Sequence, residues 1–255
     1  IGPLPMPWVA GECPVPADFG AHAMRMLLCL AFVLFGTALA AQEKTRMLFD
    51  VHLIGAKIGE ISIAGRQVNG QYAARSQFKT TGVVSALKRM HGDVSVNGRV
   101  SANQHTPGQY SEAINDGRRS TNVKVRFGGG EPRLISGDPD SSAAPADTRK
   151  LRDALDPLTA LLLILKDQPS DDLCRFRSDV YDGHRHARLS LGHRKAGQKT
   201  IACSGEYRRI SGYSASDKKE GRVPFQVFYK ASAGSMHATR VDIQTKYGKA
   251  VLLRR

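Results

Sequence analysis

The chain has 255 residues, 41% of them hydrophobic, and its 37 Lys and Arg residues outnumber its 23 Asp and Glu residues, giving a formal net charge of +14 at pH 7. That length is enough for one domain with a substantial core and does not require two. The basic residues occur as scattered pairs, and none forms a block long enough for a nucleic-acid-binding tail, so no nucleic acid partner is predicted. The charge excess favours anionic surfaces, and an ordinary solvated basic surface is the simpler interpretation.

The first 23 residues contain several prolines and the single Trp of the chain, and they show neither a helical nor a strand period. Such a composition does not support a packed core, so we predict a disordered upstream extension over residues 1–23. Two alternatives stay open: translation starts at Met24 or Met26, or the extension is a genuine cytoplasmic segment.

Residues 24–40 have the features of an export signal. Arg25 precedes an apolar run from Leu27 to Phe35, and a small-residue pattern ends at Ala40. We therefore predict a signal peptide that is cleaved between Ala40 and Ala41, and a periplasmic protein. A span of the bilayer core needs roughly 20 apolar residues, and this run is shorter, so no permanent transmembrane anchor is predicted.

Two of the four cysteines, Cys13 and Cys29, precede the predicted cleavage site. The exported part keeps Cys174 and Cys203. In an oxidising compartment such a pair is expected to form a disulfide. Metal binding is the weaker alternative, because a structural zinc site needs four ligands and these cysteines supply only two.

Beyond the signal, apolar residues recur with a period of two, which indicates β-strands. Met47, Phe49, Val51 and Leu53 fall on one face of the first such segment. The same alternation is present at residues 72–79, 121–127, 176–180, 187–191, 225–229 and 239–245. Hairpin dipeptides separate several of these segments, at Asn69-Gly70, Asn97-Gly98, Asp116-Gly117 and Asp182-Gly183. These patterns predict an antiparallel sheet with one dry face and one wet face.

One segment is predicted to be helical, at about residues 156–167. Asp156 is a suitable N-cap, Pro157 suits the first helical position, and the run from Leu158 to Leu165 is apolar on nearly all sides. A short helix of this kind requires burial, so we place it against the concave face of the sheet. The preceding residues 128–148 are rich in Gly, Pro, Ser and Asp and are predicted to be a loop within a single β-rich domain at 41–255.

His184 and His186, with Asp182 before them and His193 after, form the densest titratable cluster. Two imidazoles two positions apart on a strand share one face and can approach one metal ion. A third ligand at a firm spacing is missing, and exposed polar residues are ordinary after a hairpin turn. We therefore predict no metal site and no cofactor.

Two further groups of residues have side chains suited to catalysis or to ligand binding. Asp50 and Glu60 could pair as acid and base on neighbouring strands, although carboxylates on the wet face of a sheet are commoner. Tyr207-Arg208-Arg209 could bind an anionic head group near Cys203, or it could simply cover an edge of the sheet. The sequence has no nucleophile elbow and no phosphate loop. No catalytic residue is assigned, and we predict that the protein is not an enzyme.

Several short motifs together resemble an exported bacterial family known as domain of unknown function 3108. These motifs are Phe49 to Gly55, Ile58-Gly59-Glu60, Thr80 to Val84, Leu155 to Leu161 and Val180 to Gly183. The resemblance covers nearly all of the chain after the signal. It implies a β-rich envelope protein of unassigned biochemistry, with a spiral or half-barrel sheet wrapped around one short apolar helix, as in periplasmic lipoprotein carriers and envelope-integrity proteins.

The resulting hypothesis is a non-enzymatic periplasmic protein that supports envelope integrity and holds an amphipathic or anionic ligand between the sheet and the helix near Leu158 to Leu165. Expected partners are an envelope lipid, lipopolysaccharide, a cell-wall ligand or another envelope protein. The alternative is a hydrolase of an envelope polymer that uses His184, His186 or a carboxylate. The sequence leaves the ligand-binding residues, the ligand and the oligomeric state open.

Overall fold

In the part of the chain that the structure describes, thirteen antiparallel strands form one sheet that does not close. The structure is a computed structural model that describes residues 42–255 except 83–84, 86–88 and 139–142. The predicted extension at 1–23, the signal at 24–40 and the cleavage site at Ala40 and Ala41 lie outside the described residues. The prediction of a mainly β protein with an antiparallel curved sheet around one short apolar helix is confirmed.

The strands are β1 (Glu43–Leu53), β2 (Ala56–Val68), β3 (Gln71–Thr80), β4 (His91–Ser101), β5 (Gln104–Asn115), β6 (Ser120–Arg126), β7 (Arg133–Gly137), β8 (Phe176–Tyr181), β9 (His186–Ala196), β10 (Thr200–Ser211), β11 (Arg222–Ser232), β12 (Ser235–Thr245) and β13 (Gly248–Arg254). The helical elements are η1 (Thr148–Lys150), α3 (Pro157–Leu165), η2 (Ser170–Asp172) and α4 (Ala215–Lys219). Among the described residues, no helix is long and apolar enough to cross a membrane.

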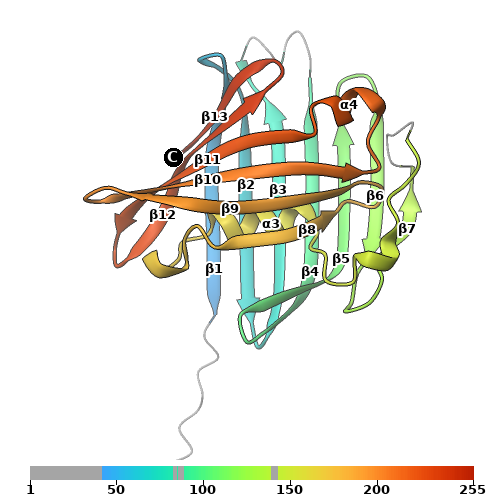
Figure 1. The fold of residues 1–255 in the computed structure, drawn as a ribbon, viewed down its shortest axis with the longest axis horizontal. Coiled ribbons are helices and arrows are strands. Elements are labelled where there is room, and N and C mark those ends of the chain that lie inside the picture. The colour runs from blue at the N-terminus through green and yellow to red at the C-terminus, as the bar shows by residue number, and fades with distance from the viewer. Residues whose placement is uncertain (1–41, 83–84, 86–88, 139–142) are drawn as a thin grey trace, which may run out of the picture. The chain divides into compact units, whose positions relative to one another are not determined.

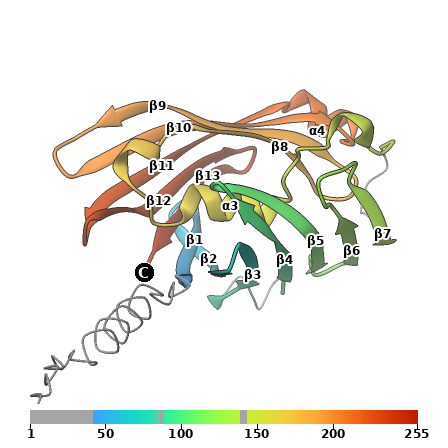
Figure 2. The ribbon, with the colours of Figure 1, turned by 90° about the horizontal axis from the view of Figure 1, so that it is seen from below.

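Each strand pairs with its neighbours in sequence, and in addition β1 pairs with β13. The first and last strands therefore meet in the middle of the sheet, and β7 and β8 form its two edges. Figure 1 shows β1–β6 running side by side with β8–β11 lying across them. In the turned view of Figure 2, α3 lies between these two layers. We call the face of the sheet toward α3 the inner face and the opposite face the outer face.

Period-two alternation fixes which side chains reach the core. Met47, Phe49 and Val51 of β1 are buried to within 8% exposure, as the sequence predicts. The dipeptides Asn69-Gly70, Asp116-Gly117 and Asp182-Gly183 do form turns between consecutive strands. In β-strands the alternate positions point to opposite faces, so these hairpins place one apolar row after another on the inner face.

The hairpin predicted at Asn97-Gly98 is wrong. This dipeptide lies inside β4, at a bulge in the pairing with β5. The ring of Tyr72 packs over Gly98, where a Cβ atom would lie 2.5 Å from Tyr72 Cε1. The glycine therefore allows a close approach of a buried tyrosine, and the chain turns instead at Ala102 and Asn103, both with positive φ.

The loop predicted at residues 128–148 also needs correction. It contains the edge strand β7, and η1 begins at its last residue. Every residue of β7 is exposed, including Leu134 and Ile135. Because neither face of this strand is buried, its sequence does not alternate between apolar and polar residues. It is a strand because it pairs with β6.

The predicted helix is confirmed, with slightly shorter bounds than expected. The Asp156 side chain accepts a hydrogen bond from the Thr159 N–H group at 2.9 Å, and Pro157 occupies the first turn. Leu158, Ala160, Leu162, Ile164 and Leu165 are buried, as expected for a helix that is apolar all round.

A disulfide joins Cys174, which follows η2, to Cys203 of β10, and the two Cα atoms are 5.2 Å apart. This is the predicted pairing. Cys203 is fully buried on the inner face, so the bond ties the segment that follows the helix to the middle of the second layer.

Candidate functional site

A hollow of about 330 Å³ lies between α3 and the inner face of β9–β13. We call it the apolar chamber; it is lined by Pro157, Ala160, Leu161, Ile164, Leu165, Val180, Asp182, Arg185, Leu189, Tyr207, Val223, Phe225, Val227, Val241, Ile243 and Leu252. Strand register explains this lining, because Val227, Val241 and Leu252 are cross-strand partners in one inner-face row. Only Asp182, Arg185 and the Tyr207 hydroxyl introduce polar atoms.

The chamber exists because the helix does not fill the inner face of the second layer. Leu161, Leu189, Phe225 and Ile243 all point inward, yet they are only half-buried. Side chains of that kind normally reach full burial in a core. Their incomplete burial leaves an apolar surface that a ligand can cover.

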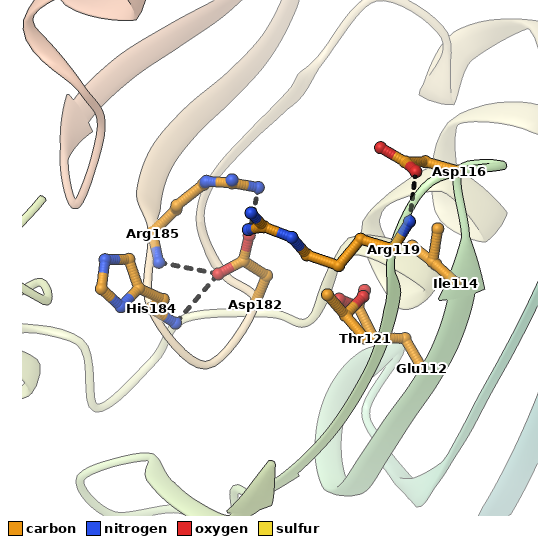
Figure 3. Close-up of a pocket in the computed structure, with 8 residues that line it drawn as sticks. All are labelled: Glu112, Ile114, Asp116, Arg119, Thr121, Asp182, His184 and Arg185. Carbon is orange, nitrogen blue, oxygen red and sulfur yellow. Dashed lines mark hydrogen bonds and ion pairs between the residues drawn. The ribbon is translucent and has the colours of Figure 1, made fainter. Parts of the chain in front are cut away.

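A second hollow, of about 150 Å³, adjoins the chamber. We call it the polar pocket; it is lined by Glu112, Ile114, Asp116, Arg119, Thr121, Asp182, His184 and Arg185 (Figure 3). Asp182 and Arg185 line both hollows, so the chamber and the polar pocket meet at these two side chains. One end of the site is therefore apolar and the other is charged.

Asp182 organises the junction between the hollows. Its Oδ1 atom accepts hydrogen bonds from the backbone N–H groups of His184 at 3.0 Å and Arg185 at 2.7 Å, and its Oδ2 atom lies 3.8 Å from Arg185 Nη1. Glu112 faces the polar pocket from β5, and the Tyr110 hydroxyl donates to its Oε2 atom at 2.5 Å. Burial raises the pKa of Glu112, which reduces the negative charge of this carboxyl group relative to an exposed one.

Two tyrosines are joined by a hydrogen bond near Arg185. The hydroxyl groups of Tyr207 and Tyr213 are 2.7 Å apart, and burial raises the pKa of Tyr207, which keeps its hydroxyl neutral. The guanidinium groups of Arg185 and Arg209 lie 5.8 and 5.7 Å from the centre of the Tyr213 ring, within the range of cation–π contact. The Tyr213 ring thus packs against Arg185, which lines the charged end of the site.

His184 and His186 do not share a strand face as predicted, because β9 begins only at His186. His184 lies in the preceding turn and lines the polar pocket, whereas His186 Nε2 is 3.0 Å from Asp179 Oδ1. Arg188 also donates to Asp179, at 2.9 Å. No cluster of three or more His, Cys, Asp or Glu residues that could hold a metal occurs in the described part of the chain.

Asp50 and Glu60 are direct cross-strand partners, but their environment suits ion pairing. Lys57 Nζ lies 2.9 Å from Asp50 and 3.0 Å from Glu60, and Arg255 donates to both carboxylates. The Arg255 and Lys57 hydrogen bonds lower the pKa of Asp50 to about 2, and the Lys57 and Arg255 hydrogen bonds lower that of Glu60 to about 2. Neither carboxyl group therefore holds a proton to donate near neutral pH.

The run Tyr207-Arg208-Arg209 is divided among three environments. Tyr207 lines the chamber, Arg208 is exposed, and Arg209 Nη1 donates to the Asp217 carbonyl at 2.7 Å. The charged residues nearest the chamber are instead Arg185 and Asp182. Sequence reasoning missed Glu112, Arg119 and Arg185, and the available signal was a repeated pattern, Asp-Gly-x-Arg, at residues 116–119 and 182–185.

These features define a class of protein: an open antiparallel sheet wrapped around one apolar helix, fastened by a disulfide and hollowed on one side of the helix. Residues 48–253 match the model of a family described as "Protein of unknown function (DUF3108)", and the chain belongs to that family. No curated protein matches the chain. Among solved structures, it is similar to a beta-barrel-like protein of domain of unknown function DUF1849 from Brucella abortus, with a TM-score of 0.47 and 10% identity over 85% of this chain and 96% of that chain.

Proposed function

We propose that this protein is an exported, non-enzymatic periplasmic protein that binds an amphipathic envelope molecule in the apolar chamber and thereby supports the integrity of the cell envelope. The observation that carries the proposal is the chamber itself, which is apolar except at Asp182, Arg185 and the Tyr207 hydroxyl and meets a charged pocket at one end. A ligand with a hydrocarbon part and a polar head matches that lining.

The size of the chamber restricts the ligand. Ligand pockets span roughly 300–1,000 Å³, and about 330 Å³ lies at the lower end of this range. One acyl chain, or a group of similar width, fits such a volume better than several chains. Each buried methylene contributes about 0.8 kcal/mol, so a chain of several methylenes can offset the cost of association.

The apolar lining of the chamber favours some of the partners expected from the sequence over others. Cell-wall polymers are polar throughout, whereas envelope lipids and lipopolysaccharide carry acyl chains that half-buried Leu161, Phe225 and Ile243 would cover. We therefore favour a lipid or lipid-like ligand. The predicted signal at residues 24–40 and the disulfide support this proposed location, because disulfides persist in oxidising compartments.

We favour a non-enzymatic role over a hydrolase because of the surroundings of two histidines and two carboxylates, His184, His186, Asp50 and Glu60. His186 is bonded to Asp179, while His184 lies in the polar pocket, so the two imidazoles have different surroundings. Asp50 and Glu60 are ionised in an exposed ion-pair cluster. If the protein is a hydrolase that uses these histidines, replacing both with Ala should abolish any hydrolysis of an envelope polymer, and an unchanged envelope phenotype in that double variant would rule the hydrolase out.

The direct test is ligand occupancy. Native mass spectrometry and lipid extraction of protein purified from its own periplasm should detect a bound amphiphile. Val223→Trp places a large ring in the chamber, whereas Leu253→Trp adds the same ring at a position that is 38% exposed and outside the chamber. We expect Val223→Trp to lose the ligand and Leu253→Trp to retain it, with both variants folded by circular dichroism.

Wild-type protein that carries no amphiphile and takes up none from solution would contradict the proposal. Equal occupancy of the Val223→Trp variant and wild type would show that any bound molecule lies outside the chamber.

A further inference from the structure

Two turns of the same four-residue pattern border the polar pocket. Asp116-Gly117-Arg118-Arg119 joins β5 to β6, and Asp182-Gly183-His184-Arg185 joins β8 to β9. Both follow the pattern Asp-Gly-x-Arg, and they belong to strands on opposite layers of the fold (Figure 1). The arginine at the end of each turn lines the polar pocket.

The two turns also share their hydrogen bonding. Asp116 Oδ1 accepts from the N–H groups of Arg118 and Arg119 at 2.8 and 2.9 Å. Asp182 Oδ1 accepts from the corresponding N–H groups, those of His184 and Arg185, at 3.0 and 2.7 Å. Each aspartate therefore fixes the backbone of the arginine three residues later. The repeated pattern presents two arginines in the same way, from opposite sides of one pocket.

The turn that carries Arg185 is held firmly from both sides. Gly183 has φ of +107° and packs so closely on β6 that a Cβ atom would lie 2.8 Å from Val123 Cγ1. The Ala146 N–H group donates to the His184 carbonyl at 2.9 Å. A rigid turn loses little conformational entropy when its arginine binds a ligand, so the site is preorganised.

Two guanidinium groups come together in the polar pocket. Figure 3 shows the guanidinium groups of Arg119 and Arg185 directed toward one another, with the Asp182 carboxylate beside them and Asp116 farther away. Glu112, the remaining acid of the pocket, has a raised pKa because of burial. Both guanidinium groups thus lie beside Asp182 in the polar pocket, and Asp182 and Arg185 also line the chamber. The planar guanidinium fork binds carboxylate and phosphate oxygens in pairs.

We propose that Arg119 and Arg185 form a clamp for the anionic head group, a carboxylate or a phosphate, of the amphiphile whose hydrocarbon part occupies the apolar chamber. This inference rests on the proposed function. Because Arg185 lines both hollows, a head group at the clamp and a chain in the chamber belong to one continuous ligand path.

Isothermal titration of the exported, disulfide-bonded protein tests the clamp with three amphiphiles that carry a twelve-carbon chain, each below its micelle concentration: dodecyl phosphate, neutral monolauroylglycerol and dodecyltrimethylammonium. Inorganic phosphate alone is the fourth probe. We expect dodecyl phosphate to bind about tenfold more tightly than monolauroylglycerol, as charge-assisted hydrogen bonds to two arginines would give, and the cation to bind most weakly.

Variants distinguish a specific contact with the two arginines from a general effect of positive charge on binding. Arg119→Gln and Arg185→Gln should each weaken dodecyl phosphate binding about fivefold or more and leave monolauroylglycerol binding unchanged. Arg119→Lys keeps the charge but loses the fork and should give an intermediate affinity. Arg126→Gln, which removes the same charge from an exposed position on β6 outside both hollows, should leave the affinity for dodecyl phosphate at the wild-type value.

Equal affinity for the phosphate and glycerol head groups would overturn the clamp while leaving ligand binding in the chamber intact. The same holds if Arg126→Gln weakens binding as much as the clamp variants. Inorganic phosphate that binds as tightly as dodecyl phosphate would mean a free-anion site, and the amphiphile clamp would be wrong. If none of the three amphiphiles binds, the proposed function fails together with the clamp.

Discussion

The two layers of the sheet pack differently against the same helix, α3. On the side of β1–β6, α3 is packed closely: Leu162 lies against Gly65 of β2, and the Tyr72 hydroxyl is 2.8 Å from Thr159 Oγ1. On the side of β9–β13, the helix leaves the apolar chamber, and inward-pointing residues such as Phe225 and Ile243 remain half-buried. One face of the helix thus completes a core, and the other forms a wall of a cavity.

The open side has its own attachments to the helix. The Tyr229 hydroxyl donates to the Ile164 carbonyl at 2.7 Å, and the disulfide links the segment after η2 to Cys203. These contacts sit around the chamber and leave its interior unfilled. The thirteen-stranded sheet therefore keeps a hollow beside a fixed helix, because a hydrogen bond and a disulfide hold the open side while close packing holds the closed side.

The largest expected loss of stability comes from a substitution on the closely packed side of α3. Leu162→Ala removes a buried side chain that contacts β2 and should lower the free energy of unfolding by about 2–5 kcal/mol. The matched variant Leu161→Ala removes the same atoms from a half-buried residue that lines the chamber. It should cost about 1 kcal/mol or less and should weaken ligand binding. Urea unfolding of both variants measures the difference, and equal losses would mean that the two faces of α3 are packed alike.

The next effect concerns the disulfide on the open side. Replacing Cys174 and Cys203 with Ala opens a loop with a sequence separation of 29 and should cost roughly 3–4 kcal/mol. Urea unfolding with and without reductant measures this cost. Reductant should destabilise the wild type and leave the double variant unchanged. A wild type whose unfolding midpoint does not respond to complete reduction would contradict the role assigned to the bond.

The smallest effect concerns Asp156, the buried N-cap of α3. Burial raises its pKa from 3.8 to about 6. Because the folded-state pKa lies above the unfolded value, the protonated carboxyl group stabilises the fold below about pH 4, and that contribution is lost as the pH rises through about 6. The loss amounts to roughly 3 kcal/mol between these limits, since one pKa unit corresponds to about 1.4 kcal/mol.

Asp156→Asn tests this dependence, because Asn also accepts the Thr159 N–H bond but does not ionise. The wild type should lose stability relative to Asp156→Asn as the pH rises from about 4 to about 7.5. Parallel stability curves for the two proteins across that range would mean that Asp156 does not ionise within it.

Much of the fold was predictable because its signals are local. Alternation marked β1, β3 and β6, the Asp156-Pro157 pair marked the start of α3, and the two cysteines that follow the predicted signal indicated one disulfide. The sequence failed where the deciding contact is distant. Asn97-Gly98 has the residues of a hairpin, but Gly98 is required by the ring of Tyr72, and β7 is a strand only because β6 pairs with it.

The candidate site was less predictable for the same reason. His184, His186, Asp50 and Glu60 drew attention as titratable groups near one another in sequence or on neighbouring strands, and the structure gives them separate partners. Arg119 and Arg185 are 66 positions apart in the numbering of the chain, and only the crossing of the two layers brings both to one pocket.

By itself, the sequence determined the antiparallel strands, the buried helix and the disulfide pair. Residue periodicity and helix capping are local signals, and only two cysteines follow the predicted signal. The tertiary structure alone decided that the first layer closes on α3 while the second layer stands away from it. That outcome depends on which large and small residues of distant strands meet the side chains of the helix, as Gly65 of β2 meets Leu162 of α3. The chamber is a property of that packing, and no single segment of the sequence contains it.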